Sequence, residues 1–442
     1  MKSLKAIFLC FTMLCMSCSS DDTTSTSNNV SIVAVETLGG SNNESGRSIV
    51  ATNDGGYAIL GYTQSNDGDI IDKQDTSFDL WIIKYNALNT IEWQKTFGGS
   101  GDDRGNSIIQ TSDGGYAILG YSFSADIDVS ENFGFQDFWL IKLNAQGDLL
   151  WEKSYGFSGA DTGISLLETN DGGLLLSGII DVTASGGLGA TNRVSPKHAG
   201  GDYWLIKTNQ NGSLEWSNYY GGNFTDTPYG IIQKDDNSFL VIGSSDSNDT
   251  DISNNLGEYD FWLLDISADG QLISEKSLGG TQIDEGRAIV STTDGNFLIA
   301  GDTRSNDLDV SNNNGGADLW LIKITPSGEV LWEKTLGGSN FDVARALEST
   351  SDGNFILAGS SRSSDNDVAI NKGQNDAWIL KVDPNGNIIW ERSVGGSNID
   401  FAYDIAQLND GSIIVTGDST SNDGDILLNQ GFTDLLLLKI ED

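Results

Sequence analysis

The chain is poor in the residues that most catalytic and metal centres require. Its 442 residues include three cysteines, four prolines and a single histidine, His198. One histidine excludes multi-histidine metal sites, and because all three cysteines lie within the first 18 residues, the rest of the chain has no thiol for a disulfide, a zinc cluster or a nucleophile. A Ser–His–Asp triad could use only His198, and no nucleophile-elbow motif is present.

Positive charge is also scarce. Lysine and arginine total 24 against 63 aspartates and glutamates, which gives a formal net charge of −39. Such a surface repels nucleic acid and anionic lipid, so we expect neither as a partner.

The N-terminus carries a targeting pattern. Residues 1–5 are basic, residues 6–17 are apolar, and Cys18 follows. This order is typical of a secretory signal peptide (residues 1–17), and the apolar segment is too short for a membrane-spanning helix. Residues 19–29 contain only Ser, Thr, Asp and Asn, which indicates a flexible tether of roughly 18 Å by random-coil scaling.

From residue 30 to residue 442 one unit repeats. Its opening glycine recurs every 58 to 65 residues, at Gly39, Gly98, Gly156, Gly221, Gly279, Gly337 and Gly395. Each unit has four short apolar runs separated by turns such as Asp113-Gly114-Gly115, which indicates four antiparallel strands. Seven such units predict an all-β, seven-bladed β-propeller. The last unit lacks its fourth strand, and we expect residues 31–38 to supply it and close the ring.

All eleven tryptophans fall at two positions of the repeat, on the third and fourth strands. We interpret them as packing between blades, with a ligand-stacking platform as the alternative. The order of the strands places the long second-to-third and fourth-to-first loops on one face, which is the expected binding face.

That face is densely acidic. One carboxylate follows five residues after each opening glycine, and if the next strand is innermost these residues ring the mouth of the central channel. The seven are Glu44, Asp103, Asp161, Asp226, Asp284, Asp342 and Asp400. A second set forms six Asp-x-Asp loops: Asp67 and Asp69, Asp126 and Asp128, Asp249 and Asp251, Asp307 and Asp309, Asp365 and Asp367, and Asp423 and Asp425.

Two interpretations of the Asp-x-Asp loops stay open. Their oxygen donors, followed in five units by an Asn and in every unit by an Asp before the third strand, suit Ca²⁺. Alternatively, the carboxylates bond nearby backbone N–H groups and only shape the loops. The spacing does not match a full EF-hand loop.

The third unit departs from the pattern. Its acidic loop is replaced by a segment seven residues longer that carries Arg193, Lys197 and His198. This basic loop is a candidate specificity element or a docking point for an acidic partner, and a drifted insertion is the alternative.

Two resemblances refine these expectations. The run that ends at Trp151 and Trp390 resembles the tryptophan-docking repeat of quinoprotein-like propellers. The Cys15-Met16-Ser17-Cys18 ending, the acidic residues after it and the Gly-Gly-Ser repeats resemble surface lipoproteins of Bacteroidota-type bacteria. The resemblance implies acylation at Cys18 and a monomeric propeller anchored to the outer membrane through that lipid alone, facing outward.

No residues match a quinone cofactor site, and no cofactor other than calcium is expected. We therefore expect a non-catalytic binding or scaffold module for a cell-surface protein or glycan. A carbohydrate-active propeller, either a lectin or a glycoside hydrolase, is the alternative. Glycoside cleavage needs a pair of carboxylates, and the abundance of aspartate supplies many such pairs without marking one of them.

Overall fold

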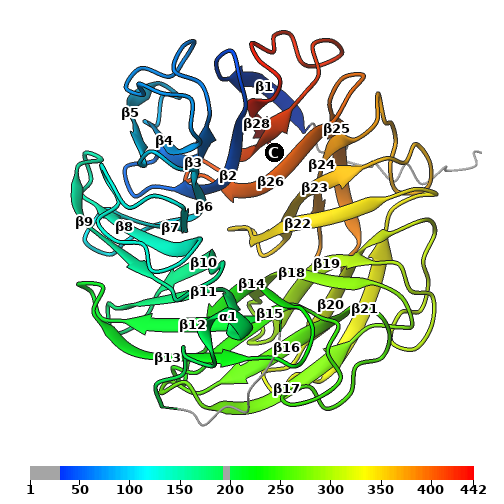
Figure 1. Ribbon diagram of the computed structural model, residues 1–442. Helices are drawn as coiled ribbons and strands as arrows, with labels where there is room; N and C mark the ends of the chain where they lie inside the picture. Colours follow the sequence, from blue (N-terminus) through cyan, green and yellow to red (C-terminus); the bar gives the residue numbers. More distant parts are fainter. Residues whose placement is uncertain (1–29, 193–199) are drawn as a thin grey trace, which may run out of the picture.

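Seven four-stranded sheets stand around a central axis in the computed structural model, which describes residues 30–192 and 200–442 (Figure 1). The order of strands follows the chain in six of the sheets, and every neighbouring pair is antiparallel, so each sheet is one blade of a propeller. The predicted all-β, seven-bladed architecture is confirmed.

The strands of the first three blades are these: β2 (Glu44–Ala51), β3 (Tyr57–Thr63), β4 (Asp79–Tyr85) and β5 (Ile91–Phe97); β6 (Asp103–Gln110), β7 (Tyr116–Ser122), β8 (Asp137–Leu143) and β9 (Leu149–Tyr155); β10 (Thr162–Glu168), β11 (Leu174–Asp181), β12 (Gly201–Thr208) and β13 (Leu214–Tyr220). A four-residue helix, α1 (Val182–Ser185), follows β11.

The next three blades consist of these strands: β14 (Asp226–Gln233), β15 (Phe239–Ser245), β16 (Asp260–Ile266) and β17 (Leu272–Leu278); β18 (Asp284–Ser291), β19 (Phe297–Thr303), β20 (Asp318–Ile324) and β21 (Val330–Leu336); β22 (Asp342–Ser349), β23 (Phe355–Ser361), β24 (Asp376–Val382) and β25 (Ile388–Val394).

The seventh blade joins the two ends of the described chain. It contains β26 (Asp400–Gln407), β27 (Ile413–Ser419) and β28 (Asp434–Glu441), and its outer strand is β1 (Ser31–Leu38). β1 pairs antiparallel with β28 from Ser31 opposite Glu441 to Leu38 opposite Leu435, and the two strands lie side by side in Figure 1. The predicted closure of the ring by the N-terminal strand is confirmed.

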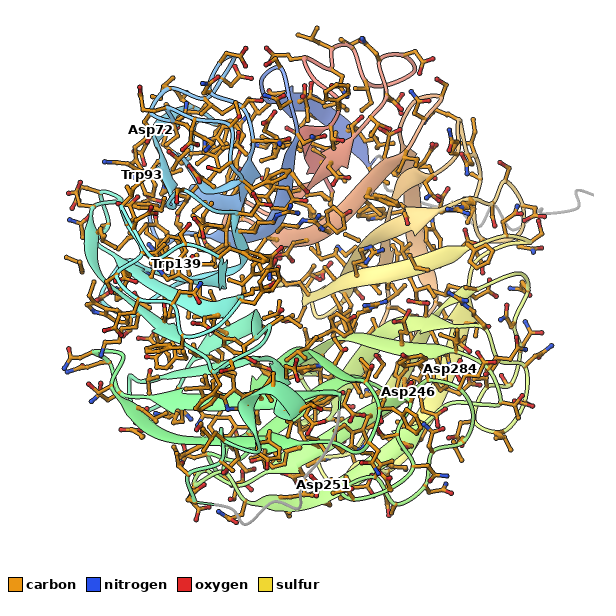
Figure 2. All side chains as sticks on the ribbon, in the orientation of Figure 1. Asp72, Trp93, Trp139, Asp246, Asp251 and Asp284 are labelled. Carbon is orange, nitrogen blue, oxygen red and sulfur yellow. The ribbon has the colours of Figure 1, made fainter. Side chains whose placement is uncertain are left out.

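The core lies between the blades, because the middle strands are apolar on both faces and are covered on both sides. In β4 and β8 every residue is buried. The six third-strand tryptophans are at most 3% exposed. Trp139 and Trp93, both labelled in Figure 2, belong to one apolar cluster where the first and second blades meet. Their role as packing between blades is therefore the one that the structure supports.

A repeated backbone hydrogen bond connects consecutive blades. The residue that begins an inner strand donates its N–H to the carbonyl just before the third strand of the preceding blade, as Asp342 does to Ala317 O at 2.8 Å. The seventh and first blades share the same bond, from Glu44 N to Thr433 O at 2.7 Å. The junction that closes the ring is thus built like the others.

Every innermost strand contains a β-bulge at the same place. The pairing of first and second strands skips one residue, for example between Gly46 and Ser48 in the first blade. The skipped residues are Arg47, Asn106, Ile164, Tyr229, Arg287, Arg345 and Tyr403. A bulge bends the strand and re-aims the side chain of the extra residue, which bears on the lining of the channel described below.

Candidate functional site

The long loops lie together on one face and bond to one another, as the strand order predicts. The first aspartate of each Asp-x-Asp loop accepts the N–H of the residue after the Gly-Gly pair, as Asp67 Oδ1 does from Ser41 at 2.8 Å. The same bond recurs at the first aspartate of the other five loops, which are Asp126, Asp249, Asp307, Asp365 and Asp423.

The second aspartate of each loop is tied to the first glycine of the Gly-Gly pair. Asp69 Oδ2 accepts the N–H of Gly39 at 3.0 Å, and the N–H of Asp69 donates to Gly39 O at 2.9 Å. The other five second aspartates make the same pair of bonds. They are Asp128 with Gly98, Asp251 with Gly221, Asp309 with Gly279, Asp367 with Gly337 and Asp425 with Gly395, and their carboxylate oxygens lie 3.1–3.3 Å from the glycine nitrogens.

The middle residue of several Asp-x-Asp loops has a left-handed backbone. In the second blade this residue is Ile127, with φ of 58° and a side chain that is 78% exposed. A β-branched side chain is strained in this region, so the surrounding hydrogen bonds must hold the loop in place. The loop face is therefore a fixed surface.

The carboxylates of these loops are engaged with donors of the protein itself. Among the described residues no group of three or more acidic, cysteine or histidine side chains is arranged to hold a metal ion. Asp69, Asp128, Asp251, Asp309, Asp367 and Asp425 each direct an oxygen to a glycine N–H, and Asp425 also pairs with Lys372 Nζ at 2.6 Å. The reason is the spacing, because two aspartates that alternate along a short loop reach two successive backbone donors of the adjacent turn.

The asparagines expected as further calcium ligands are engaged as well. Asn313 Nδ2 donates to Thr303 O at 3.1 Å, and Asn313 Oδ1 accepts from Gly315 N at 2.9 Å. These contacts support the loop-shaping alternative, and calcium binding itself stays a prediction.

The seven carboxylates expected at the mouth of the channel are buried instead. All seven have no exposed surface, and none lines the channel cavity. Asp342 is representative, because its carboxylate accepts hydrogen bonds from Gly338 N at 2.7 Å and Ser363 Oγ at 2.6 Å, and from Ser361 Oγ. The expected open acidic ring is thus a set of internal supports that fix the Gly-Gly turn to the second strand.

The aspartate before each third strand completes this buried acidic layer. In the fifth blade Asp318 accepts the N–H of Asn314 at 2.6 Å through Oδ2, while its Oδ1 is buried without a hydrogen-bond partner. A Cβ added at Gly337 would lie 2.6 Å from Asp318 Oδ1 and 2.9 Å from Asp342 Oδ2, so two carboxylates flank one glycine. The same unpartnered oxygen occurs in Asp137, Asp260 and Asp376.

In the first blade the equivalent aspartate, Asp79, has a cation beside it. There Lys73, whose side chain is only 1% exposed, donates to Asp79 Oδ2 at 2.7 Å. In the fourth blade burial raises the pKa of Asp260 to about 7, and the nearby charge of Asp284 adds to the shift. A buried carboxylate is stabilised by hydrogen bonds, by a nearby cation or by a proton.

The basic residues Arg193, Lys197 and His198 lie outside the described residues. The parts of this insertion that are described cover an apolar cavity of about 270 Å³ beside Trp204. Trp204 Nε1 donates to Gly189 O of the insertion, whereas the equivalent Trp139 donates to Glu152 on its own blade. In the third blade Ser217 occupies the position of that glutamate, and the insertion replaces its function as acceptor.

An aromatic patch that the sequence analysis did not single out lies on the loop face of the first two blades. It consists of Tyr62, Phe78, Tyr121, Phe123 and Phe135. Ring centroids are 5.5 Å apart for Tyr62 and Phe78, 6.0 Å for Tyr121 and Phe123, and 4.9 Å for Phe123 and Phe135. Arg104 lies over this patch, 3.9 Å from the centroid of Phe78 and 4.7 Å from that of Tyr62. Phe135 is 68% exposed and makes the patch accessible.

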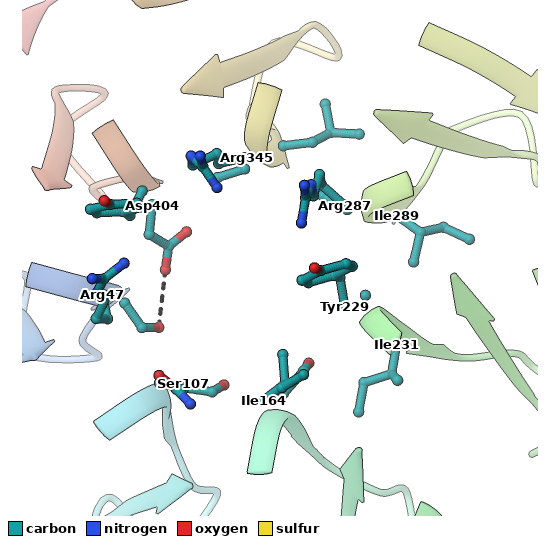
Figure 3. Close-up of a pocket in the computed structure, with 17 residues that line it drawn as sticks. Arg47, Ser107, Ile164, Tyr229, Ile231, Arg287, Ile289, Arg345 and Asp404 are labelled. Atoms are coloured by element: carbon teal, nitrogen blue, oxygen red, sulfur yellow. Dashed lines mark hydrogen bonds between the residues drawn. The ribbon is translucent and has the colours of Figure 1, made fainter. Parts of the chain in front are cut away.

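The second feature missed from the sequence is the lining of the channel. All seven bulge residues line a central cavity of about 430 Å³, together with their neighbours in the inner strands (Figure 3). Three of the seven are arginines and two are tyrosines. The position three residues after each buried carboxylate was the available signal, but nothing in the repeat marks it as a bulge.

The fold and these surfaces define a β-propeller with a fixed loop face and a lined central channel. No family model matches the chain, and no curated protein matches it. Within residues 30–192 and 200–442 no helix has the length and apolar character needed to cross a membrane.

Solved structures resemble it at low sequence identity. A protein of unknown function from Dyadobacter fermentans is 11% identical, with a TM-score of 0.46 over 94% of this chain and 99% of that one. The α-L-arabinofuranosidase Arb93A from Fusarium graminearum is 8% identical, with a TM-score of 0.45 over 76% and 91%. Sqt1 from Chaetomium thermophilum is 10% identical, with a TM-score of 0.43 over 87% and 83%.

Proposed function

We propose that this chain is a cell-surface lipoprotein whose propeller binds a protein or glycan through its loop face, without catalysis. The aromatic patch is the observation that carries the binding role. Exposed aromatic side chains gathered on a rigid surface supply contact area at little cost in side-chain entropy, and they are enriched in interfaces. Around the patch, the Asp-x-Asp loops hold carboxylates in fixed positions that can define specificity.

The same patch suits a glycan. Sugar rings pack against aromatic side chains, and the nearby carboxylates can accept hydrogen bonds from sugar hydroxyls. A glycoside hydrolase would further require two opposed carboxylates with access to the sugar. The carboxylates of the inner strands are fully buried, and those of the Asp-x-Asp loops are bonded to backbone N–H groups of the adjacent turn. We therefore place the lectin form of the carbohydrate alternative ahead of the hydrolase form.

Substitution of Phe135 by alanine tests the binding face. We expect at least a tenfold loss of binding in a glycan array and in binding to intact cells of the source bacterium, because the patch loses its exposed ring. Phe432, which is 72% exposed at the equivalent position of the seventh blade, provides the matched control, and Phe432→Ala should bind normally. The proposal would be overturned if Phe135→Ala bound as well as Phe432→Ala, or if the protein hydrolysed a bound glycan.

The anchor is tested separately at Cys18, which lies outside the described residues. The Cys18→Ala variant should move from the membrane fraction to the soluble fraction, because acylation of that thiol is the proposed attachment. Protease added to intact cells should degrade the wild-type chain if it faces outward. Retention of Cys18→Ala in the membrane fraction would contradict lipid anchoring, whatever the result for Phe135.

A further inference from the structure

The channel concentrates positive charge in a molecule that has little of it. Five consecutive bulge positions, in the fourth to seventh blades and then the first, are Tyr229, Arg287, Arg345, Tyr403 and Arg47. Figure 3 shows Arg47, Arg287, Arg345 and Tyr229 around one cavity. The cavity volume, about 430 Å³, is in the range of small-molecule sites.

The tyrosines hold the arginines in position. The guanidinium carbon of Arg47 lies 4.1 Å from the ring centroid of Tyr403, and that of Arg287 lies 4.3 Å from Tyr229. Arg345 shares Tyr403 with Arg47, at 5.3 Å. Stacking on an aromatic face fixes a guanidinium and leaves its N–H edge free to donate.

The carboxylates near these arginines do not satisfy all of them. Arg287 pairs with Glu285 at 2.9 Å, and Arg47 donates to the hydroxyl of Tyr62 at 2.6 Å. Arg345 has no carboxylate within 4.0 Å among the described residues, and its Nε is buried without an acceptor. Burial lowers the pKa of Arg345, and the positive charges of Arg287 and Arg47 add to that shift.

Asp404, the one carboxylate among the residues that line the cavity, is already engaged. It accepts from Ser48 Oγ at 3.0 Å and from Ile49 N at 2.8 Å. The opposite wall is formed by Asn106, Ser107 and Ile164. A ligand in the cavity would therefore meet guanidinium groups and tyrosine rings on one side, and amide and hydroxyl groups on the other.

We propose that the central channel binds a small organic oxyanion: a hydroxylated ring of monosaccharide size that carries a carboxylate or a phosphate group. Arg345 would be its main partner, because a planar guanidinium matches the two oxygens of either group. The ring would lie between the stacked arginine–tyrosine pairs and the opposite wall, whose amide and hydroxyl groups suit its hydroxyls. The site adjoins the aromatic patch, because Arg47 donates to the hydroxyl of Tyr62. Arg345 lies over Tyr403 and Phe401, which are not part of the patch, so substitutions of Arg345 and Phe135 test the two sites separately.

Isothermal titration of the full chain carrying Cys18→Ala tests the proposal, with glucuronate, glucose 6-phosphate, neutral glucose and inorganic phosphate as probes. We expect at least one of the two organic anions to bind with a dissociation constant below about 1 mM, and the stronger of them identifies the group that is recognised. Binding of neither, binding of glucose with equal affinity, or binding of inorganic phosphate alone would overturn the proposal.

Two variants, with one control, test whether the ligand binds in the channel. Arg345→Gln should weaken binding at least tenfold, whereas Arg392→Gln removes the same charge from the outer strand β25 and should leave binding unchanged. Ile164→Glu places a carboxylate on the opposite wall and should also weaken binding, without removing any hydrogen bond of the fold. Melting curves identify a variant that fails to fold. Unchanged affinity in folded Arg345→Gln and Ile164→Glu would overturn the assignment to the channel.

Discussion

A chain that begins at residue 39, and so lacks β1, should lose about 5 kcal/mol of its free energy of unfolding. Seven residue pairs join β1 to β28, and Ile32, Val35 and Leu38 pack against the core. The shortened chain also lacks Val30, which is buried in the same core, whereas the other three side chains are half-buried. These four side chains contribute about 1 kcal/mol each, and the hydrogen bonds add smaller net amounts. The loss is comparable with the total stability of many domains.

Urea unfolding and gel filtration would measure this effect. The matched control is a chain that begins at Val30, which keeps β1 and should unfold at the same urea concentration as the longer protein. Without β1 the edge of β28 is exposed, so the shortened chain should also self-associate. A synthetic peptide of residues 30–40 should restore the monomer by adding the missing strand. A shortened chain that stays monomeric with an unchanged midpoint would show that the ring does not depend on β1.

Stability should increase as the pH falls from 8 to 5.5, by about 3–5 kcal/mol in total. Burial raises the pKa of Asp161, Asp226 and Asp260 to about 7, far above the value of an exposed aspartate. A carboxyl group whose pKa is higher in the folded state binds more protons there than in the unfolded chain. Its contribution is fully present below the unfolded pKa and is lost as the pH rises through about 7.

Other carboxylates reverse the trend in stronger acid. Hydrogen bonds from Thr111, Gly115 and Lys142 outweigh burial and lower the pKa of Asp113 to about 2. The stability that this group provides is present above its unfolded pKa and is lost as the pH falls toward 2. Maximal stability is therefore expected in mildly acidic solution, at about pH 5.

Urea unfolding at several pH values checks this prediction, and two variants locate its source. Asp260→Asn removes one buried titrating group and should flatten the profile between pH 5.5 and 8, whereas Asp235→Asn changes an exposed residue and should not. Stability that rises with pH over this range would contradict the argument.

Repeating the urea unfolding with calcium and with a chelator distinguishes stabilisation by protonation from stabilisation by a bound metal. We expect equal curves, because backbone donors already occupy loop carboxylates such as Asp309 and Asp367. A higher midpoint with calcium at pH 8 would support the calcium alternative.

The architecture could be predicted because the same signals recur in every unit. Turn glycines, strand length and continuous apolar runs such as the one around Trp139 each indicate a four-stranded sheet, and seven copies leave one ring to build. The missing last strand then identified residues 31–38 as its replacement.

The site was harder to predict, because the direction of a side chain depends on contacts between blades. In the sequence Asp342 has the pattern of an exposed loop carboxylate, yet Ser361 at the end of the second strand, Ser363 after it and the glycine turn enclose it. In the sequence Arg345 is one of three charged residues of its strand, and nothing there indicates that the bulge turns it into the channel. The aromatic patch joins residues from two units, so no single repeat reveals it.

The bulge has a consequence for how this architecture can diversify. The extra residue is left out of the pairing between the first and second strands. The pairing of the sheet therefore does not restrict which side chain it carries. Arginine, asparagine, isoleucine and tyrosine all occupy this position in one chain without altering the blade. The ring therefore offers seven positions around one axis whose side chains can vary, subject to contacts such as that of Arg47 with Tyr403, while the blades stay the same.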